Sequence, residues 1–247
     1  MLMRYRVDLS YLGRDFHGWQ KQPNAVTVQQ TIEDAFSVVF KDKIEFMGCG
    51  RTDTGVHARE FTAHFDSERE YNKANVRKLN NYLPFSISIK SIVKTKNDFH
   101  ARFDAISRTY EYHITVYKNP FRKEFSWFIP IRLNIELMNK CAKGLYEYKD
   151  FTSFSKLHTD VKTNNCDVKY AHFTLQDDLL VFEITADRFL RNMVRAIVGT
   201  LVDVGKGKMT QDEFVKVIEA KDRSKAGQSA PAKGLFLTKI SYPNQSE

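Results

Sequence analysis

The loop Gly48-Cys49-Gly50-Arg51-Thr52-Asp53-Thr54-Gly55-Val56-His57-Ala58-Arg59 interrupts the regular patterns on either side of it. Its three glycines disfavour a helix or strand and allow positive φ and close backbone approach, so they predict a shaped loop. One carboxylate, Asp53, and one guanidinium, Arg51, lie two residues apart in it. By themselves these residues also fit a β-turn whose Asp bonds to its own backbone.

Strand and helix patterns surround this loop in the order β-α-β-β-α-β. Residues 3–11 alternate as in a half-buried strand. Thr27 and Gln30 can form a capping box before one helix, and Asn72 can cap a second helix that stops at Pro84. Further strands are expected near residues 44–47, 58–65 and 85–89. This order predicts a ferredoxin-like arrangement.

The same order returns in the second half of the chain. The patterns predict strands near 110–116, 166–175, 179–186 and 235–240, a helix opened by Asn134, a strongly periodic helix over 190–202 and a short helix boxed by Thr210 and Glu213. We therefore expect an α+β protein of two ferredoxin-like halves, residues 1–104 and 105–247. Their mostly antiparallel sheets are expected to meet around a central cleft.

Charge and cysteine usage narrow the class of protein. The 247-residue chain has a formal net charge of +8 and a pI of about 9.2, which favours a polyanionic partner. Cys49, Cys141 and Cys166 are isolated, so neither a disulfide framework nor a zinc site is expected. The N-terminus is too charged for a signal peptide, and no apolar run approaches transmembrane length. We expect a cytoplasmic protein that does not span a membrane.

Several further side chains carry chemistry outside the loop. Tyr110 fits either a core tyrosine at a strand start or a ring that stacks on a base. Arg188, Arg191 and Arg195 are expected along one side of the periodic helix, where a solvated basic edge also explains them. A metal is not expected, because an Asp53/His57 pair lacks a third ligand nearby. The histidines are expected to be structural or to face RNA: His17, His57, His64 and His100.

The glycine loop closely resembles the signature of the tRNA pseudouridine synthase A family, Gly-(small)-Gly-Arg-Thr-Asp-(Ala)-Gly-Val-His-Ala. The chain departs from it in having Thr54 where the family usually has alanine. Other stretches resemble the family in the same order along the chain: Tyr11-x-Gly13-x-x-Phe16-x-Gly18-Trp19-Gln20-x-Gln22-Pro23, Thr27-Val28-Gln29, Arg108-x-Tyr110-x-Tyr112, Met193-Val194-Arg195-x-x-Val198-Gly199 and Ala226-Gly227-x-x-Ala230-Pro231-Ala232-x-Gly234-Leu235.

This resemblance implies a pseudouridine synthase fold and an enzyme that isomerises uridine to pseudouridine at positions 38 to 40 of the anticodon stem-loop of tRNA. It implies no cofactor and a homodimer in which one tRNA contacts both subunits. Asp53 would be the catalytic nucleophile, Tyr110 would contact the target uracil and Arg195 would pair with Asp53. Arg51 would occupy the gap left when the uridine is flipped out of the stem.

Two other functions also fit parts of the sequence. A non-catalytic RNA-binding protein of two ferredoxin-like halves would share the fold. An Asp-dependent phosphodiesterase would need a carboxylate cluster to hold a metal, and the sequence offers none. The intact Arg51-Thr52-Asp53 together with Tyr110 and Arg195 favours the isomerase.

Overall fold

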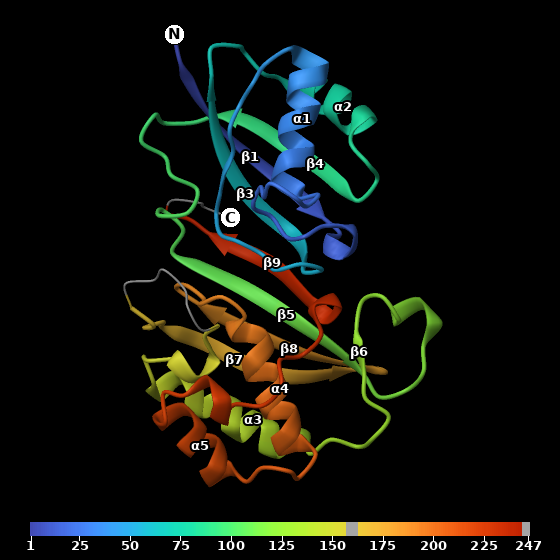
Figure 1. Cartoon of the computed structure of the whole chain (residues 1–247), viewed down its shortest axis with the longest axis vertical. Coiled ribbons are helices and arrows are strands. Elements are labelled where there is room, and N and C mark those ends of the chain that lie inside the picture. Colours follow the sequence, from blue (N-terminus) through green and yellow to red (C-terminus); the bar gives the residue numbers. More distant parts are fainter. Residues whose placement is uncertain (157–162, 244–247) are drawn as a thin grey trace. The chain divides into compact units, whose positions relative to one another are not determined.

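The computed structural model describes residues 1–156 and 163–243, and the chain divides into two compact units. The first unit comprises Met1–Ile106 and the segment from Leu237 onward, and the second comprises Ser107–Phe236. Figure 1 shows the helices and strands of each unit. Whether the predicted halves 1–104 and 105–247 behave as domains stays a prediction.

The first unit has the predicted order β-α-β-β-α-β. Its elements are β1 (Met3–Tyr11), α1 (Val28–Phe40), β2 (Met47–Gly48), β3 (His57–Ser67), α2 (Lys73–Tyr82) and β4 (Ile87–Lys94). The strands lie in the order β4-β1-β3, with β2 paired to β3 and β9 (Leu235–Ser241) also beside β3. The pairs β1–β3, β1–β4 and β2–β3 are all antiparallel.

Local signals define the helices of this unit. Asn72 caps α2 and forms a reciprocal capping box with Asn75. Thr27 caps α1 by accepting a bond from the Gln30 N–H, but the Gln30 side chain donates to Asp34 Oδ1, 2.6 Å away, so only half of the predicted box is seen. The core beneath the helices is aromatic, with ring contacts among Tyr5, Phe36, Phe40, Phe46, Phe65 and Tyr71.

The second unit contains a sheet with strand order β5-β8-β7 and antiparallel pairing between these neighbours. The short strand β6 is the exception, since it pairs parallel to β5. The elements are β5 (Ser107–Thr115), β6 (Trp127–Phe128), α3 (Ile135–Gly144), β7 (Val168–Gln176), β8 (Leu179–Ala186), α4 (Met193–Gly205) and α5 (Gln211–Glu219). The predicted α+β class with mostly antiparallel sheets is confirmed.

Helix α4 lies at the centre of the second unit. Eleven of its thirteen residues are buried, and it contacts α3 and α5 (Figure 1). A helix buried on nearly all sides belongs to the core rather than to a surface layer. Asn134 caps α3, and Thr210 and Glu213 form the expected capping box of α5. Within the described ranges, we find no helix with both the length and the apolar character needed to span a membrane.

The start of α4 differs from the sequence prediction. The helix begins at Met193 because Asn192 adopts a left-handed conformation, with φ of 67°. Arg188 and Arg191 therefore precede the helix, and the predicted row of arginines along one side of it is wrong for these two residues. Arg195 lies in the first turn of α4.

Candidate active site

The glycine loop connects β2 to β3 in the first unit. Residues 49–56 contain no helix or strand, as predicted, and the Cys49 N–H donates to the Thr62 carbonyl on β3 at 2.8 Å. Asp53 is half-buried, and its carbonyl accepts a bond from the Val56 N–H at 3.1 Å. Gly55 has φ of +79°, a value that glycine adopts without strain. The backbone that carries the Asp53 carboxylate is thus a closed turn.

A second loop, residues 12–20, holds this turn from outside. The Trp19 N–H donates to the Thr52 carbonyl at 3.3 Å, and the Gly55 N–H donates to the Phe16 carbonyl at 3.3 Å. These bonds reach the glycine loop on both sides of Asp53. The backbone that carries Asp53 is therefore held by contacts between two segments about 35 residues apart.

Two glycines make this close approach possible. A Cβ at Gly13 would lie 1.9 Å from the Val56 carbonyl oxygen, and a Cβ at Gly18 would lie 2.3 Å from the Thr52 carbonyl oxygen. Gly18 also has φ of +87°. No side chain fits at either position, which explains why glycines stand in this stretch of the sequence.

Buried aromatic rings support the loops. Trp19 stacks on Phe61 of β3 with ring centroids 4.0 Å apart, and Tyr11 lies 5.5 Å from the same ring. The Tyr11 hydroxyl also lies 2.9 Å from Thr52 Oγ1. All three rings are buried, so Thr52, the residue before Asp53, contacts a closely packed aromatic cluster.

Of the four histidines considered in the sequence analysis, two have structural roles. His57 is buried, and its Nδ1 accepts a bond from the Gly13 N–H at 3.1 Å, which ties the two loops together. His64 Nδ1 accepts from the Ala101 N–H at 3.1 Å. Burial lowers the pKa of His64 to about 4, and the charges of Arg4 and His100 act in the same direction. His17 is exposed, and the ring of His100 lies against Phe103.

Tyr110 lies on β5 of the second unit, opposite Ile184 on β8. Its side chain is only partly buried, and its ring meets Phe189 edge-on, with centroids 5.2 Å apart and an interplanar angle of 88°. The fully buried tyrosine of this strand is Tyr112 instead. The ring of Tyr110 is therefore oriented by Phe189 without being enclosed, unlike that of a core tyrosine.

Arg195 is held by the segment that precedes β9. Its Nε donates to the Ala230 carbonyl at 2.7 Å, and the Ala230 N–H donates back to the Arg195 carbonyl at 2.9 Å. The segment can run against α4 because a Cβ at Gly199 would lie 1.8 Å from the Gln228 carbonyl oxygen. The Tyr112 hydroxyl donates to the Pro231 carbonyl at 2.8 Å and fixes the same segment.

The predicted site residues are divided between the two units. Asp53 and the exposed Arg51 share the glycine loop, whereas Tyr110 and Arg195 belong to the second unit. The sequence did not reveal that Arg195 bonds to the Ala230 carbonyl. It also did not reveal that Tyr11 and His57 hold the loops together. The only sequence signal for these contacts was the set of glycines at positions 13, 18 and 199.

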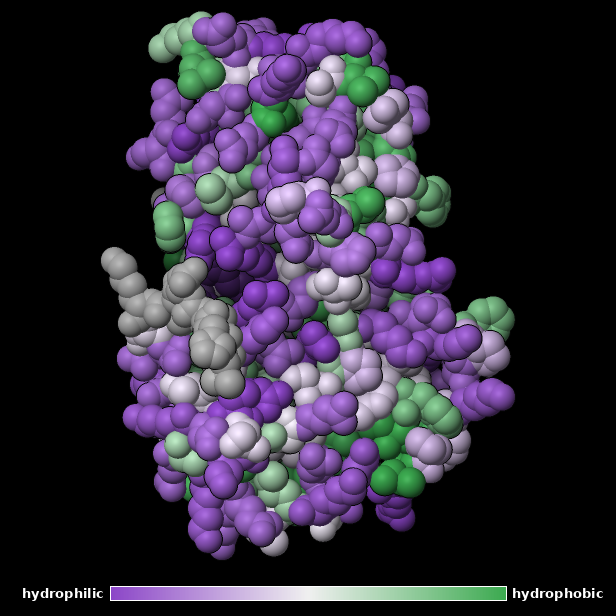
Figure 2. Space-filling view, viewed as in Figure 1, coloured by the Kyte–Doolittle hydropathy of each residue, from purple (hydrophilic) through white to green (hydrophobic). Residues whose placement is uncertain are grey.

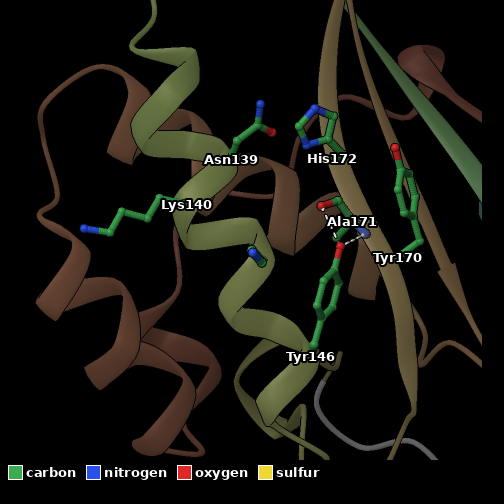
Figure 3. A pocket seen from close by; sticks show the side chains of 7 residues that line it. Asn139, Lys140, Tyr146, Tyr170, Ala171 and His172 are labelled. Atoms are coloured by element: carbon green, nitrogen blue, oxygen red, sulfur yellow. Dashed lines mark hydrogen bonds between the residues drawn. The ribbon is translucent and has the colours of Figure 1, made fainter.

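A pocket of about 410 Å³ lies elsewhere in the second unit, between α3 and β7, and contains none of these four residues. Tyr146 Oη accepts from the Ala171 N–H at 2.9 Å and donates to the Ala171 carbonyl at 3.2 Å. The Asn139 amide makes the same double contact with Phe173. Figure 3 shows Tyr146 and Asn139 directed towards β7 and Lys140 pointing away from it. The polar groups here satisfy the backbone of an edge strand.

Known proteins resemble this chain over almost its whole length. A family model described as tRNA pseudouridine synthase matches residues 9–104 and 147–243, which include Arg51, Asp53 and Arg195 but not Tyr110. The tRNA pseudouridine synthase A of Parabacteroides distasonis is 52% identical over 99% of this chain and 98% of that protein. The proteins of the same name from Bacteroides thetaiotaomicron and Bacillus subtilis are 50% and 39% identical, each over 98% of this chain and over 91% and 100% of their own lengths.

Proposed function

Because this chain belongs to the tRNA pseudouridine synthase A family and therefore isomerises uridine to pseudouridine in tRNA, we propose that it acts in the anticodon stem-loop with Asp53 as its nucleophile. The family expected from the glycine loop is thereby confirmed. The positions 38 to 40 and the roles of individual side chains are our proposal. The observation that carries it is the half-buried carboxylate of Asp53, held in a turn that backbone bonds secure on both sides.

The reaction moves one glycosidic bond and needs no change in oxidation state. The N1–C1′ bond of the uridine breaks, the uracil turns, and C5 joins C1′. C5 then loses its proton, and N1 gains one, so the atoms balance. Asp53 begins this sequence by attack at C1′, by addition to C6 or by removal of a ribose proton. A carboxylate on a fixed backbone is aimed before the substrate arrives, which lowers the cost of reaching the transition state.

The other site residues act around Asp53 in this proposal. Arg195 pairs with the Asp53 carboxylate, favours its ionised form and fixes its direction. Tyr110 stacks on the uracil, and its hydroxyl helps to remove the C5 proton. Arg51, exposed beside Asp53, fills the space that the flipped uridine leaves in the stem. The net charge of +8 supports binding of the tRNA phosphates.

We further propose that the protein works in the cytoplasm as a homodimer and that one tRNA contacts both subunits. The family resemblance supports the dimer. The three cysteines are buried, and none of them forms a disulfide within the described part of the chain, which suits a reducing compartment.

The test uses tRNA transcripts labelled with tritium at C5 of uridine, incubated with the protein without added metal. We expect tritium release, with pseudouridine mapped at positions 38 to 40. Transcripts with a single uridine at 38, 39 or 40 resolve which position reacts. Product confined to uridines outside the anticodon stem-loop would contradict the proposed target while leaving the isomerase activity intact.

A further inference from the structure

Helix α2 of the first unit presents a basic surface. From Tyr71 to Asn97 the chain contains six lysine or arginine residues and no aspartate or glutamate, although the whole chain has a net charge of only +8. Three of these cations lie on α2 with exposed side chains: Lys73, Arg77 and Lys78. We call these three residues the basic face of α2. A cluster of cations on one helix is typical of a surface that binds a polyanion.

The basic face lacks the acidic partners that accompany cations on an ordinary solvated helix. Within the part of the chain that the structure describes, none of its three side chains forms a salt bridge or a hydrogen bond. Helix α5, by contrast, has one lysine among three acids, and α1 has two acids and no cation. Lys73 and Arg77 lie one turn apart, where like charges repel. A bound anion would relieve this repulsion, so the helix favours an anionic partner.

The backbone of α2 is held firmly in the first unit. The capping box of Asn72 and Asn75 fixes its start, and Leu79 is buried on its inner side. Near its end, the Asn80 side chain donates to the Ile89 carbonyl and accepts from the Ile89 N–H, both at 2.8 Å, which ties the helix to β4. A surface on an ordered backbone loses little conformational entropy when a ligand binds.

Two exposed aromatic side chains follow the basic face. Tyr82, the last residue of α2, is exposed by 53%, and Phe85, in the turn before β4, is fully exposed. In Figure 2, hydrophobic surface projects at the right-hand edge of the first unit, where Figure 1 shows the turn from α2 to β4. An aromatic ring beside cations is the combination that binds single-stranded nucleic acid, because the cations hold phosphates and the ring stacks on a base.

The turn that carries Phe85 lies at the same end of the sheet as the glycine loop. The residue after it, Ser86, accepts through its carbonyl from the Leu12 N–H at 2.8 Å, and Leu12 begins the loop that holds the turn around Asp53. The strand pairing agrees, because the last residue of β1 pairs with the first residue of β4 and with the second residue of β3. The basic face of α2 therefore extends from the end of the sheet that carries Asp53.

We propose that the basic face of α2 binds phosphates of the tRNA and that Phe85 stacks on an unpaired base of the same RNA. This inference rests on the proposed action on tRNA and adds a contact surface outside the glycine loop. Phosphate contacts fix the position of a nucleic acid without reading its sequence. The surface therefore holds the tRNA in place while Asp53 acts on the uridine.

The charges of the surface distinguish RNA from a protein partner. An exposed phenylalanine alone would suit either one. Protein interfaces, however, are depleted of lysine, and the neighbouring stretch from Tyr71 to Asn97 has cations without a single acid. The substrate of this family is itself a polyanion, and its phosphates match a surface of one sign.

The test measures the dissociation constant of a full-length tRNA transcript by filter binding over a series of salt concentrations. The triple variant Lys73→Gln/Arg77→Gln/Lys78→Gln should raise the dissociation constant about tenfold or more at low salt and reduce the salt slope by about two to three. Phe85→Leu keeps an apolar side chain but has no ring, so it should weaken binding about fivefold or more without changing the salt slope. The single-turnover rate at saturating enzyme should stay that of the wild type in both.

Two further variants are the controls. Lys140→Gln/Lys143→Gln/Lys216→Gln removes three exposed lysines from α3 and α5 and should leave affinity and salt slope close to those of the wild type. The charge-preserving variant Lys73→Arg/Arg77→Lys/Lys78→Arg should bind like the wild type. Circular dichroism and urea unfolding verify that each variant is folded.

The possible failures are distinguishable. Wild-type affinity and salt slope in the triple glutamine variant of α2 would overturn the inference. An equal loss in the control on α3 and α5 would also overturn it, because net charge alone would then explain the effect. A rate lost at saturating enzyme with unchanged affinity would contradict a binding surface. A wild type that binds tRNA but releases no tritium would overturn the proposed reaction, and the binding measurements on α2 would still stand.

Discussion

The hydroxyl of Tyr11 lies 2.9 Å from Oγ1 of Thr52, the residue that precedes Asp53. Both side chains are buried, with exposed fractions of 3% and 9%. Tyr11 is the last residue of β1, so this contact ties the glycine loop directly to the central strand of the first unit. A long-range contact of this kind transmits the rigidity of a sheet to the glycine loop.

Replacing Tyr11 by phenylalanine tests that connection. The ring and its packing on Phe61 stay, but Thr52 loses its hydroxyl partner, so we expect stability to fall by about 1 kcal/mol. The single-turnover rate should fall about tenfold, with unchanged tRNA affinity, because only the aim of Asp53 is disturbed. Tyr71→Phe is the matched control, since it removes a hydroxyl bonded to Asp42 in the same unit. Equal rates for the two variants would contradict a positioning role.

Asp53→Asn should abolish turnover. Asparagine keeps the shape and the backbone bonds of the turn but cannot act as an ionised nucleophile or base. Binding of tRNA should remain close to that of the wild type, because removing a negative charge near phosphates does not weaken their attraction. Asp15→Asn, at an exposed position of the neighbouring loop, should retain activity. Pseudouridine above background from a contaminant-free Asp53→Asn preparation would refute the assignment.

Local patterns predicted most of the fold. Alternation predicted β1 and β5, and the caps at Asn72, Asn134 and Thr210 marked three helix starts, because these signals depend on residues close together in the chain. The start of α4 was misjudged because its apolar period extends back to Leu190. The left-handed Asn192 sets the actual boundary, with its side chain bonded to Ser229, 37 residues away.

In the candidate site too, local motifs could be read from the sequence and long-range contacts could not. The glycine loop and the residues Asp53 and Arg195 could be selected from motifs. The contacts that hold these residues could not be predicted, because they join segments far apart in the chain. They link Thr52 with Trp19, Gly13 with His57, and Arg195 with Ala230. A glycine in the sequence indicates that a side chain does not fit at its position, but it does not indicate which segment lies against it.

His64 should make the stability of the protein depend on pH. Its pKa falls from the ordinary 6.5 to about 4 in the folded protein, chiefly through burial. Between these values the unfolded chain binds a proton that the folded protein does not, so acidification favours unfolding. The contribution of neutral His64 to the free energy of unfolding is complete above pH 6.5 and is lost as the pH falls towards 4.

The measurement is the urea midpoint of unfolding across this pH range. His64→Asn removes the titrating group and keeps an acceptor for the Ala101 N–H, so its midpoint should fall less on acidification than that of the wild type. His17→Asn, at an exposed position, should follow the wild type. Parallel curves for wild type and His64→Asn would contradict the lowered pKa.

Tyr110 should separate binding from proton transfer. Tyr110→Phe keeps the ring and its edge-on contact with Phe189, so stacking should persist while the single-turnover rate falls. Tyr110→Ala should lose both affinity and rate. Tyr170→Phe removes the hydroxyl of an exposed tyrosine on β7 and should leave both unchanged. A wild-type rate for Tyr110→Phe would show that the hydroxyl takes no part.

Arg195 should not tolerate even a conservative replacement. Its Nε is committed to the Ala230 carbonyl, so the rest of the planar guanidinium is aimed by a side chain that is already anchored. Lysine keeps the charge but has all its donors on one nitrogen, so it loses the planar fork whose separate nitrogens would bind Ala230 and the proposed partner Asp53. We therefore expect Arg195→Lys to lower the single-turnover rate by about a hundredfold or more, with a much smaller effect on tRNA affinity.

Arg191→Lys and Arg191→Ala provide the contrast, because Arg191 is exposed and precedes the helix. If Arg191 contacts only a phosphate, lysine should preserve binding, whereas alanine should weaken it and reduce the salt slope by about one. Neither change should alter the rate at saturating enzyme. Full activity in Arg195→Lys would refute the pairing with Asp53. A loss of tRNA affinity like that of Arg191→Ala, without a loss of rate, would instead reduce Arg195 to one more phosphate contact.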